Sequence, residues 1–505
     1  MKKGLFIYLF LFFSVSLFSQ TPAVEWQKML GGSAVDEGKV IRQTADGGYI
    51  IGANSWSNDG DVTENYGYQD IWIVKTDASG DIEWQRSIGG SSAEAVYAIQ
   101  QTTDGGYIVG GETLSNDGDV SENHGSRDYW VVKLDHEGNI EWQRTFGGSS
   151  DETAMSVKQT TDGGYIVAGS TYSNDGDISG NHGEFDNWVV KLDPVGNMEW
   201  QKTYGGSSGD FAYSIQQTAD GGYVMAGYTI SEDGDVSNNY GESDAWVVKI
   251  DSSGNIEWEK SFGGSGEEVA VHILQTADNG YILAGTTTTQ NDGDVSGYHG
   301  IQDYWVVKLD ETGNMEWQKC LGGSGYDSAS SIQQTIDGGY IVTGLTESTD
   351  GDVSGNGEGF SIAWTIKLDA SGSIAWQKCV GSGGTGANDI QQTTDGGFIF
   401  TGWQILSVFD SAVWVVKLEA EILGTTEFEN QIALYPNPTT GIINIQTKEK
   451  INSVSIYNSA GQKVSFNSLN KENTSIDLSN LSNGVYFVEI ILDNKTVKRY
   501  KVIRK

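Results

Sequence analysis

Short apolar segments recur along most of the chain in a fixed order of four, separated by Gly, Asp, Asn and Ser. In one copy these segments are 99–102, 107–109, 130–134 and 140–144. Runs of this kind, rich in Val, Ile, Tyr and Trp and bounded by turn residues, are typical of β-strands. The Asp-Gly pair at 104–105, between the first two segments, indicates a tight hairpin turn. Each copy therefore predicts four short antiparallel strands.

The copies repeat with a nearly constant period, which a Trp in the fourth segment marks. This Trp stands at positions 26, 84, 142, 200, 258, 317 and 376, so the spacing is 58 or 59 residues. A steady period indicates a repeat architecture in which one small unit is copied and stacked. Four antiparallel strands per unit are the composition of a β-propeller blade.

The two ends of the repeat region predict how it closes. The chain begins this region with a lone fourth segment, 24–28, and the last copy supplies only three segments, ending at Leu418. Pairing the first segment with the last three would complete a blade and leave no exposed sheet edge at the seam. The sequence thus predicts an all-β fold: a seven-bladed β-propeller over residues 21–419, closed by its N-terminal strand.

Fourteen of the sixteen Trp residues fall in two repeat columns. The second column lies in the third segment and comprises positions 72, 130, 188, 246, 305, 364 and 414. Burying one Trp contributes about 3 kcal/mol by area, so we expect both columns to hold the blades together rather than to form a binding stripe. Trp56 and Trp403 lie outside the columns and are candidates for a local contact.

The N-terminus predicts export. Residues 1–20 combine a basic start with a short apolar run and a small residue, Ser19, near a cleavage point, which is typical of a secretory signal peptide. The run is too short for a comfortable transmembrane helix, and no later stretch is apolar enough to cross a bilayer.

The negative charge of the chain is concentrated in the repeats. The net charge of the chain is −38. The two lysines of the signal contribute +2, and the tail from 431 to 505, with ten basic and five acidic side chains, contributes +5. Residues 21–430 therefore carry −45. Such a field disfavours nucleic acid and anionic membranes as partners of that region. Cations, cationic polymers and neutral glycans remain open.

Long loops carrying Asp-Gly-Asp are expected on one face of the ring, opposite the tight turns, and this acidic face is where we expect function. The paired carboxylates, followed in most copies by Asn and a further Asp such as Asp128, are the hard oxygen ligands that Ca²⁺ prefers. The spacing is not that of an EF-hand loop. Asx turns kept soluble by surface carboxylates are the alternative. The candidate calcium ligands are Asp59, Asp61, Asp117, Asp119, Asp175, Asp177, Asp233, Asp235, Asp292, Asp294, Asp350 and Asp352.

No catalytic constellation emerges from the sequence. Three of the five histidines, at 124, 182 and 299, share a column with Tyr66 and Tyr240, which favours a structural role over a general base. Nucleophile elbows, zinc motifs and phosphate loops are missing from the sequence. No catalytic residue and no certain cofactor is therefore assigned.

The turn before the fourth segment spaces Asp, Gly and Trp as in Asp77-x-x-Gly80-x-x-x-Trp84. This pattern resembles the repeat of quinoprotein (pyrroloquinoline quinone) propellers and covers residues 24–419. The resemblance implies that the Trp docks neighbouring blades. It does not extend to the single asymmetric cofactor site of those enzymes.

After a linker at 420–430, residues 431–505 show short alternating runs with Pro, Gly and Asn turns, which predict a small β-sandwich. The runs at 435–438 (Tyr-Pro-Asn-Pro), 483–487 (Asn-Gly-Val-Tyr-Phe) and 501–503 (Lys-Val-Ile) resemble the C-terminal sorting domain of the type IX secretion system. The resemblance implies handling by that machinery, and release or surface attachment in a Bacteroidetes-type bacterium. A generic carbohydrate-binding sandwich is the alternative.

These observations favour a secreted or cell-surface binding or adhesion module over an enzyme. Near-identical blades argue for binding, because catalysis needs one site that differs from the others. Its acidic face would meet a glycan, a protein or a calcium-bridged ligand. The alternative is an extracellular propeller enzyme, either a quinoprotein-like dehydrogenase or a polysaccharide-cleaving enzyme.

Overall fold

The computed structural model describes residues 21–357, 359–421, 432–435, 439–458, 462–493 and 497–505. The predicted signal peptide and most of the predicted linker lie outside these residues. The described chain forms two compact units, Thr21–Glu421 and the part that follows Ile422. Every regular element described is a β-strand.

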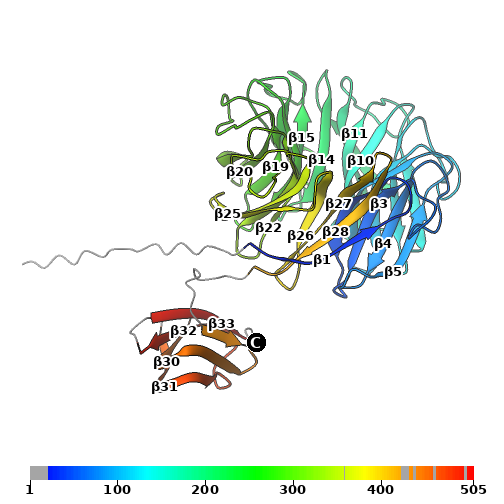
Figure 1. Ribbon diagram of the computed structural model, residues 1–505. Coiled ribbons are helices and arrows are strands. Elements are labelled where there is room, and N and C mark those ends of the chain that lie inside the picture. Colours follow the sequence, from blue (N-terminus) through cyan, green and yellow to red (C-terminus); the bar gives the residue numbers. More distant parts are fainter. Residues whose placement is uncertain (1–20, 358, 422–431, 436–438, 459–461, 494–496) are drawn as a thin grey trace, which may run out of the picture. The chain divides into compact units, whose positions relative to one another are not determined.

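Six of the seven blades are four-stranded antiparallel sheets built from consecutive strands (Figure 1). The first contains β2 (Asp36–Gln43), β3 (Tyr49–Ser55), β4 (Asp70–Thr76) and β5 (Ile82–Ile88). The others are β6 (Glu94–Gln101), β7 (Tyr107–Thr113), β8 (Asp128–Leu134) and β9 (Ile140–Phe146); β10 (Glu152–Gln159), β11 (Tyr165–Thr171), β12 (Asp186–Leu192) and β13 (Met198–Tyr204); β14 (Asp210–Gln217), β15 (Tyr223–Thr229), β16 (Asp244–Ile250) and β17 (Ile256–Phe262); β18 (Glu268–Gln275), β19 (Tyr281–Thr287), β20 (Asp303–Leu309) and β21 (Met315–Leu321); β22 (Asp327–Gln334), β23 (Tyr340–Thr346), β24 (Ile362–Leu368) and β25 (Ile374–Val380).

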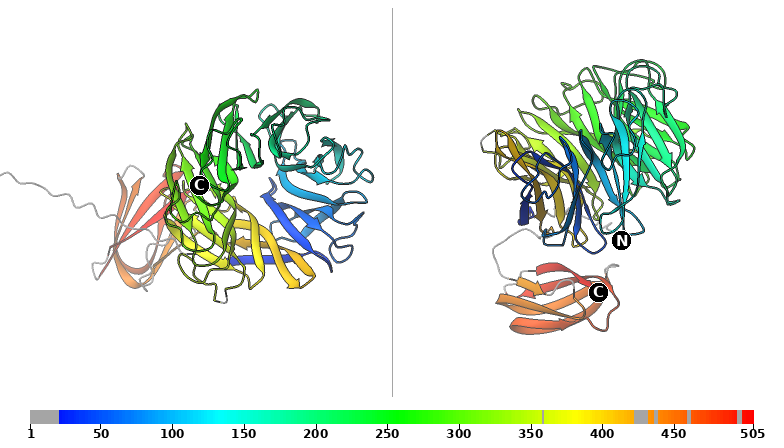
Figure 2. Two further views of the ribbon diagram at one scale, coloured as in Figure 1. Left: turned by 90° about the horizontal axis from the view of Figure 1, so that it is seen from above. Right: turned by 90° about the vertical axis from the view of Figure 1, so that its right-hand side faces the viewer.

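The seventh blade is made from both ends of the repeat region. Its strands are β26 (Thr385–Gln392), β27 (Phe398–Ser407), β28 (Asp410–Leu418) and the N-terminal β1 (Val24–Leu30), which pairs antiparallel with β28. The blades stand around a common axis (Figure 2). The predicted propeller, closed by its N-terminal strand, is therefore confirmed.

The two Trp columns hold the ring together in different ways. The third-strand Trp residues are almost wholly buried, and each indole N–H donates to a Gln or Glu side chain on the fourth strand, as Trp130 does to Gln143 at 2.9 Å. A fourth-strand Trp instead packs edge-on against a Tyr or Phe of the next blade, as Trp84 does against Tyr107 with ring centroids 5.9 Å apart. The expectation that both columns hold the blades together is confirmed.

A buried Lys on each third strand forms ion pairs with carboxylates of the same blade. In blade one the Lys75 ammonium lies 3.0 Å from Asp46 and 2.7 Å from Glu83. Burial alone would raise the pKa of Asp46, but hydrogen bonds from Thr44 and Gly48 and the Lys75 charge together lower it to about 2. The equivalent cations are Lys133, Lys191, Lys249, Lys308, Lys367 and Lys417.

Seven Gln side chains join the first strands of neighbouring blades at the tight-turn end. Each Oε1 accepts a hydrogen bond of 2.8 or 2.9 Å from a backbone N–H in the tight turn of the preceding blade. This contact explains why Gln recurs at the end of the first segment in every copy. The seven are Gln43, Gln101, Gln159, Gln217, Gln275, Gln334 and Gln392.

The C-terminal unit is all-β, as predicted, and its five strands are hydrogen-bonded into one sheet. Its strands are β29 (Ile432–Tyr435), β30 (Ile442–Asn458), β31 (Lys463–Asp477), β32 (Gly484–Leu492) and β33 (Val497–Arg504). The long strand β30 pairs with β29 along its first part and with β32 along its second, while β31 follows its other edge. A core of Ile, Val and Leu side chains fills this unit.

Candidate functional site

The long loops meet on one face of the ring, as the sequence predicts. The loop that joins two blades, such as 31–33, lies against the Asp-Gly-Asp loop of the following blade. There the backbone N–H of Ser33 donates to Asp59 Oδ1 at 2.7 Å, and the N–H of Gly31 donates to Asp61 Oδ2 at 3.1 Å. We refer to this surface as the loop face.

The twelve predicted aspartates divide into two structural roles. The first member of each pair, the Asp59 type, accepts a hydrogen bond of 2.7 or 2.8 Å from a Ser backbone N–H. The second member, the Asp61 type, faces a Gly N–H at 3.1 to 3.4 Å. Each pair thus binds two points of the neighbouring loop, and its carboxylates are not brought to a common centre.

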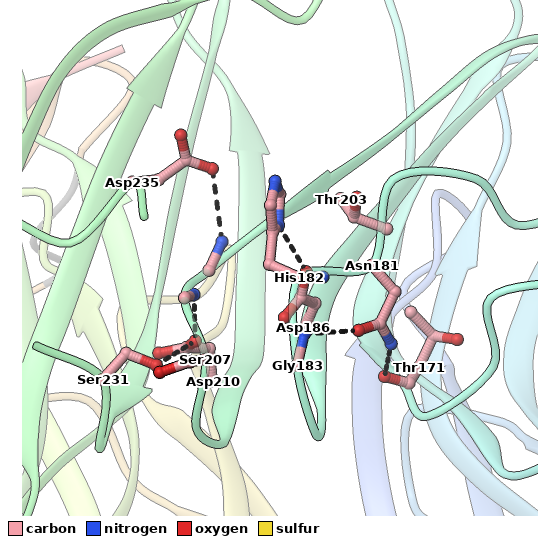
Figure 3. Close-up of polar contacts among 12 residues, drawn as sticks. Thr171, Asn181, His182, Gly183, Asp186, Thr203, Ser207, Asp210, Ser231 and Asp235 are labelled. Carbon is pink, nitrogen blue, oxygen red and sulfur yellow. Dashed lines mark hydrogen bonds and ion pairs between the residues drawn. The ribbon is translucent and has the colours of Figure 1, made fainter. Parts of the chain in front are cut away.

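A different pair of carboxylates converges between blades. Asp186 begins β12, Asp210 begins the next blade, and both are fully buried (Figure 3). A Cβ on Gly205 would lie 2.5 Å from Asp210 Oδ2 and 2.8 Å from Asp186 Oδ1, so both carboxylates border the same spot. The third neighbour, Asp235, faces the Gly205 N–H at 3.3 Å. We call this group the junction cluster.

The His182 imidazole lies beside the junction cluster, with its Nδ1 2.7 Å from Asp186 Oδ2, and the hydrogen bonds of the cluster are incomplete. Asp210 Oδ2 accepts from Gly206 N–H and Ser231 Oγ–H, both at 2.8 Å, while Asp186 Oδ2 accepts from the His182 backbone at 2.9 Å. The buried Asp186 Oδ1 has no hydrogen-bond partner among the described residues. Burial raises the pKa of Asp210 to about 6 despite its hydrogen bonds. These carboxyls therefore favour a proton or a cation beside them.

The junction cluster recurs at five blade junctions. Its first carboxylate is Asp70, Asp128, Asp186, Asp244 or Asp303, and in each of them Oδ1 has no partner within the described chain. Its Oδ2 always accepts from the backbone N–H four residues earlier, at Tyr66, His124, His182, Tyr240 and His299. The backbone donor is common to Tyr and His, and in the three copies with His the ring Nδ1 also lies 2.6 to 2.8 Å from the same Oδ2.

Between blades six and seven all parts of the cluster change together. Ile362 and Thr385 replace the two carboxylates, and the Asp-Gly-Asp loop is replaced by the β27–β28 hairpin. Between blades seven and one, Asp36 and Asp61 remain although Ala412 stands in place of the first carboxylate, so the three parts also vary separately. The structure has no group of three or more His, Cys, Asp or Glu side chains that could hold a metal ion, as far as its described residues go. Calcium binding by the twelve predicted aspartates stays a prediction.

The loop face also carries an aromatic strip that the sequence analysis missed. Tyr172, Phe185, Phe211 and Tyr228 contact one another in series, with ring centroids 4.9, 4.9 and 4.8 Å apart, and Tyr213 follows at 6.1 Å. Tyr172 is exposed, and the others are half-buried. The strip is confined to blades three and four, so variation between copies at these positions was the available signal.

Trp56, which the sequence singled out, occupies in blade one the position that Tyr172 occupies in blade three. It lines a cavity of about 210 Å³ together with Tyr97, Glu112 and Arg127. Trp403 occupies the position of Tyr228 and covers Gly386, where a Cβ would lie 2.3 Å from its ring. Trp56 and Trp403 thus occupy two repeat positions on the loop face whose residue type differs from blade to blade.

Comparisons with known proteins address the tail directly. Residues 433–505 match the family model of the secretion system C-terminal sorting domain. A search of curated proteins found no match. The described residues include no helix long and apolar enough to cross a membrane.

Solved structures similar to the chain include several proteins at low identity. PorZ, a surface component of the type-IX secretion system of Porphyromonas gingivalis, has 10% identity and a TM-score of 0.34 over 95% of this chain and 75% of its own. The Neurospora crassa Pan2 WD40 domain has 12% identity and a TM-score of 0.37 over 77% and 90%. A Dyadobacter fermentans protein of unknown function has 9% identity and a TM-score of 0.40 over 79% and 99%. With its sorting domain, the chain is a propeller protein exported through the type IX system, secreted or displayed on the cell surface of a Bacteroidetes-type bacterium.

Proposed function

We propose that the exported propeller is a binding module whose loop face recognises an extracellular glycan or protein. The observation that carries this proposal is the aromatic strip from Tyr172 to Tyr228, because partly exposed aromatic side chains in mutual contact supply large contact area at low entropic cost. Around it, the structural contacts repeat from blade to blade. A scaffold of repeated blades with one distinctive strip suits recognition of one partner.

The test is binding of the ring to an array of neutral and acidic glycans and to extracellular proteins, followed by variants. Tyr172→Ala and Tyr228→Ala each remove part of the strip, and we expect affinity to fall at least about tenfold. Glu347 occupies in blade six the position that Tyr172 occupies in blade three, so Glu347→Ala serves as the matched control. Unchanged affinity in both Tyr variants would contradict this function.

The rival function is an extracellular enzyme. The same protein is assayed for dye reduction with pyrroloquinoline quinone and for polysaccharide cleavage. Two results together would replace the binding proposal with an enzymatic one. The first is turnover that a single point substitution abolishes, and the second is unchanged binding by the loop-face variants in every binding assay.

The junction clusters support calcium as a structural ligand of the loop face. The unpartnered Asp186 Oδ1 lies beside Asp210, and two carboxylates with added backbone or water oxygens make a hard-ligand site. We expect millimolar Ca²⁺ at pH 7.5 to raise the melting temperature, and the combined Asp186→Asn, Asp210→Asn variant to lose part of that rise. Equal melting temperatures with Ca²⁺ and with chelator would reject calcium and leave a shared proton as the occupant.

A further inference from the structure

The central channel contains an asymmetric set of charges. It is lined by the first strand of every blade, and two of the residue columns that line it carry the charges. One column contains Val40, Ala98, Ser156, Ser214, His272, Ser331 and Asp389, and the other, two residues further along, contains Arg42, Gln100, Lys158, Gln216, Leu274, Gln333 and Gln391. These substitutions make the lining of the channel asymmetric.

Asp389 is fully engaged by the protein. Arg42 forms an ion pair with its Oδ2, which also accepts from the Ile41 backbone N–H at 2.9 Å. The Ser331 hydroxyl donates to its Oδ1 at 3.0 Å. Asp389 therefore balances Arg42 and has little capacity left for a second cation.

His272 is a neutral donor in this channel. Its Nδ1 accepts from the Ile332 backbone N–H at 3.3 Å, which assigns the ring proton to Nε2. Burial, with the nearby Lys158 and Arg42 charges, lowers the pKa of His272 to about 4, although Asp389 acts in the opposite direction. At neutral pH the imidazole thus adds an N–H donor without adding charge.

Lys158 supplies a cation without a direct partner. Its ammonium makes no hydrogen bond or ion pair with the residues that the structure describes. Burial and the Arg42 charge lower its pKa to about 8, against the opposing effect of Asp389. Arg42, Lys158 and Asp389 together leave one positive charge, inside a ring whose surface is strongly acidic. Lys158 is partly exposed to the channel, so an anion that enters the channel can pair with its ammonium.

The surrounding lining is rich in donors. Two cavities, of about 100 and 370 Å³, share Arg42, Lys158 and His272 as their common wall. The larger cavity is also lined by Gln100, Gln216 and Gln333, whose Oε1 atoms accept from backbone N–H groups at 2.9, 2.9 and 2.6 Å. Their amide NH₂ groups remain as donors facing a space that suits a small molecule.

We propose that the channel binds the carboxylate of a small hydroxylated organic acid. Lys158 and Arg42 hold the carboxylate by charge-assisted hydrogen bonds, and His272 Nε2–H adds a third donor. The hydroxylated body occupies the larger cavity, where the Gln amides donate to its oxygens. This site is independent of the loop face, so either can fail without the other.

Calorimetry with sodium glucuronate, and with glucose as the neutral partner, tests the site on the whole secreted chain. We expect saturable binding of glucuronate on the order of millimolar or tighter, and no binding of glucose. Lys158→Gln installs the residue that four other blades carry, and it should weaken glucuronate at least about tenfold. Lys202→Gln, on the outer strand β13, removes the same charge from an exposed position and should leave the affinity unchanged.

A pH profile of the unmodified protein provides a second measurement that does not depend on a variant. Lys158 is faced by Arg42 on β2, His272 on β18 and Asp389 on β26, and of these groups Lys158 is expected to lose its charge nearest pH 8. Glucuronate affinity should fall as the pH rises through 8. Equal affinity in Lys158→Gln and wild type, a flat profile between pH 7 and 9, or binding of glucose as tight as glucuronate would each overturn the proposal.

Discussion

Replacing Lys158 by Gln should stabilise the ligand-free ring. In blades two, four, six and seven the equivalent Gln accepts a backbone N–H from the next blade, as Gln100 does from Gln159 at 2.9 Å. In blade three the corresponding donor is the N–H of Gln217. The substitution therefore removes an unpaired ammonium and adds a hydrogen bond that the fold already uses elsewhere.

The size of the gain follows from the ionisation of Lys158. Lowering its pKa from 10.5 to about 8 corresponds to about 3 kcal/mol of destabilisation, and water in the channel reduces this to about 2 kcal/mol. A neutral hydrogen bond adds about 1 kcal/mol. We thus expect Lys158→Gln to raise the free energy of unfolding by about 1–3 kcal/mol at pH 7.

The pH dependence identifies the cause. A Lys whose folded pKa is lowered destabilises the fold fully below about pH 8, and this effect disappears as the pH rises through its unfolded value of 10.5. The advantage of Lys158→Gln should therefore shrink between pH 8 and 10.5. Guanidinium unfolding at pH 7 and pH 10, with Lys202→Gln as the control, measures both values. A variant less stable than wild type at pH 7, or a gain that is the same at pH 10, would refute the reasoning.

Three further predictions concern the ring. Deleting residues 21–31 removes β1 from the seventh blade and exposes the edge of β28. The melting temperature should therefore fall sharply, and size-exclusion chromatography should detect association of the chain. A variant that stays monomeric with an unchanged melting temperature would contradict closure by β1. Gly138→Ala should lower the free energy of unfolding by about 2–4 kcal/mol, because a Cβ there would lie 2.7 Å from Trp84 and φ is +83°. Gly105→Ala is the control: φ is +88° but nothing lies within 4 Å, so the loss should be only about 1–2 kcal/mol. Equal losses would mean that Trp84 does not determine how the blades dock. Burial raises the pKa values of Asp210 and Asp244 to about 6, so without added cations the melting temperature should decline as the pH rises from 4 through 6. Asp244→Asn should weaken that decline. A melting temperature that is constant over this range would exclude charge burial at the junctions.

The architecture was accessible from the sequence because local signals repeat. The period of the Trp column and the Asp-Gly turns identify the blades, and the lone segment at 24–28 identifies the closure. The sorting domain was accessible for the same reason, since its turns and strands lie in order along 435–503. Each of these inferences needed only neighbouring residues.

The sites were less accessible because their partners lie in other copies. Asp59 and Asp61 look like a ligand pair in one loop, yet each accepts a backbone N–H from the loop between blades. Asp186 and Asp210 converge only when two blades pack together. Arg42 and Lys158 were visible as departures from Gln in a repeated column, but the sequence does not say that this column faces the channel.

The position of β28 bears on how the protein withstands mechanical load. The chain leaves the ring at Leu418, the end of a strand that is hydrogen-bonded to β27 on one side and to β1 on the other. If the chain is attached to a cell on its C-terminal side, drag on the ring is applied to an inner strand held by two ladders instead of an edge strand that could peel away. Anchoring tension is thereby distributed over the same seam that closes the circle.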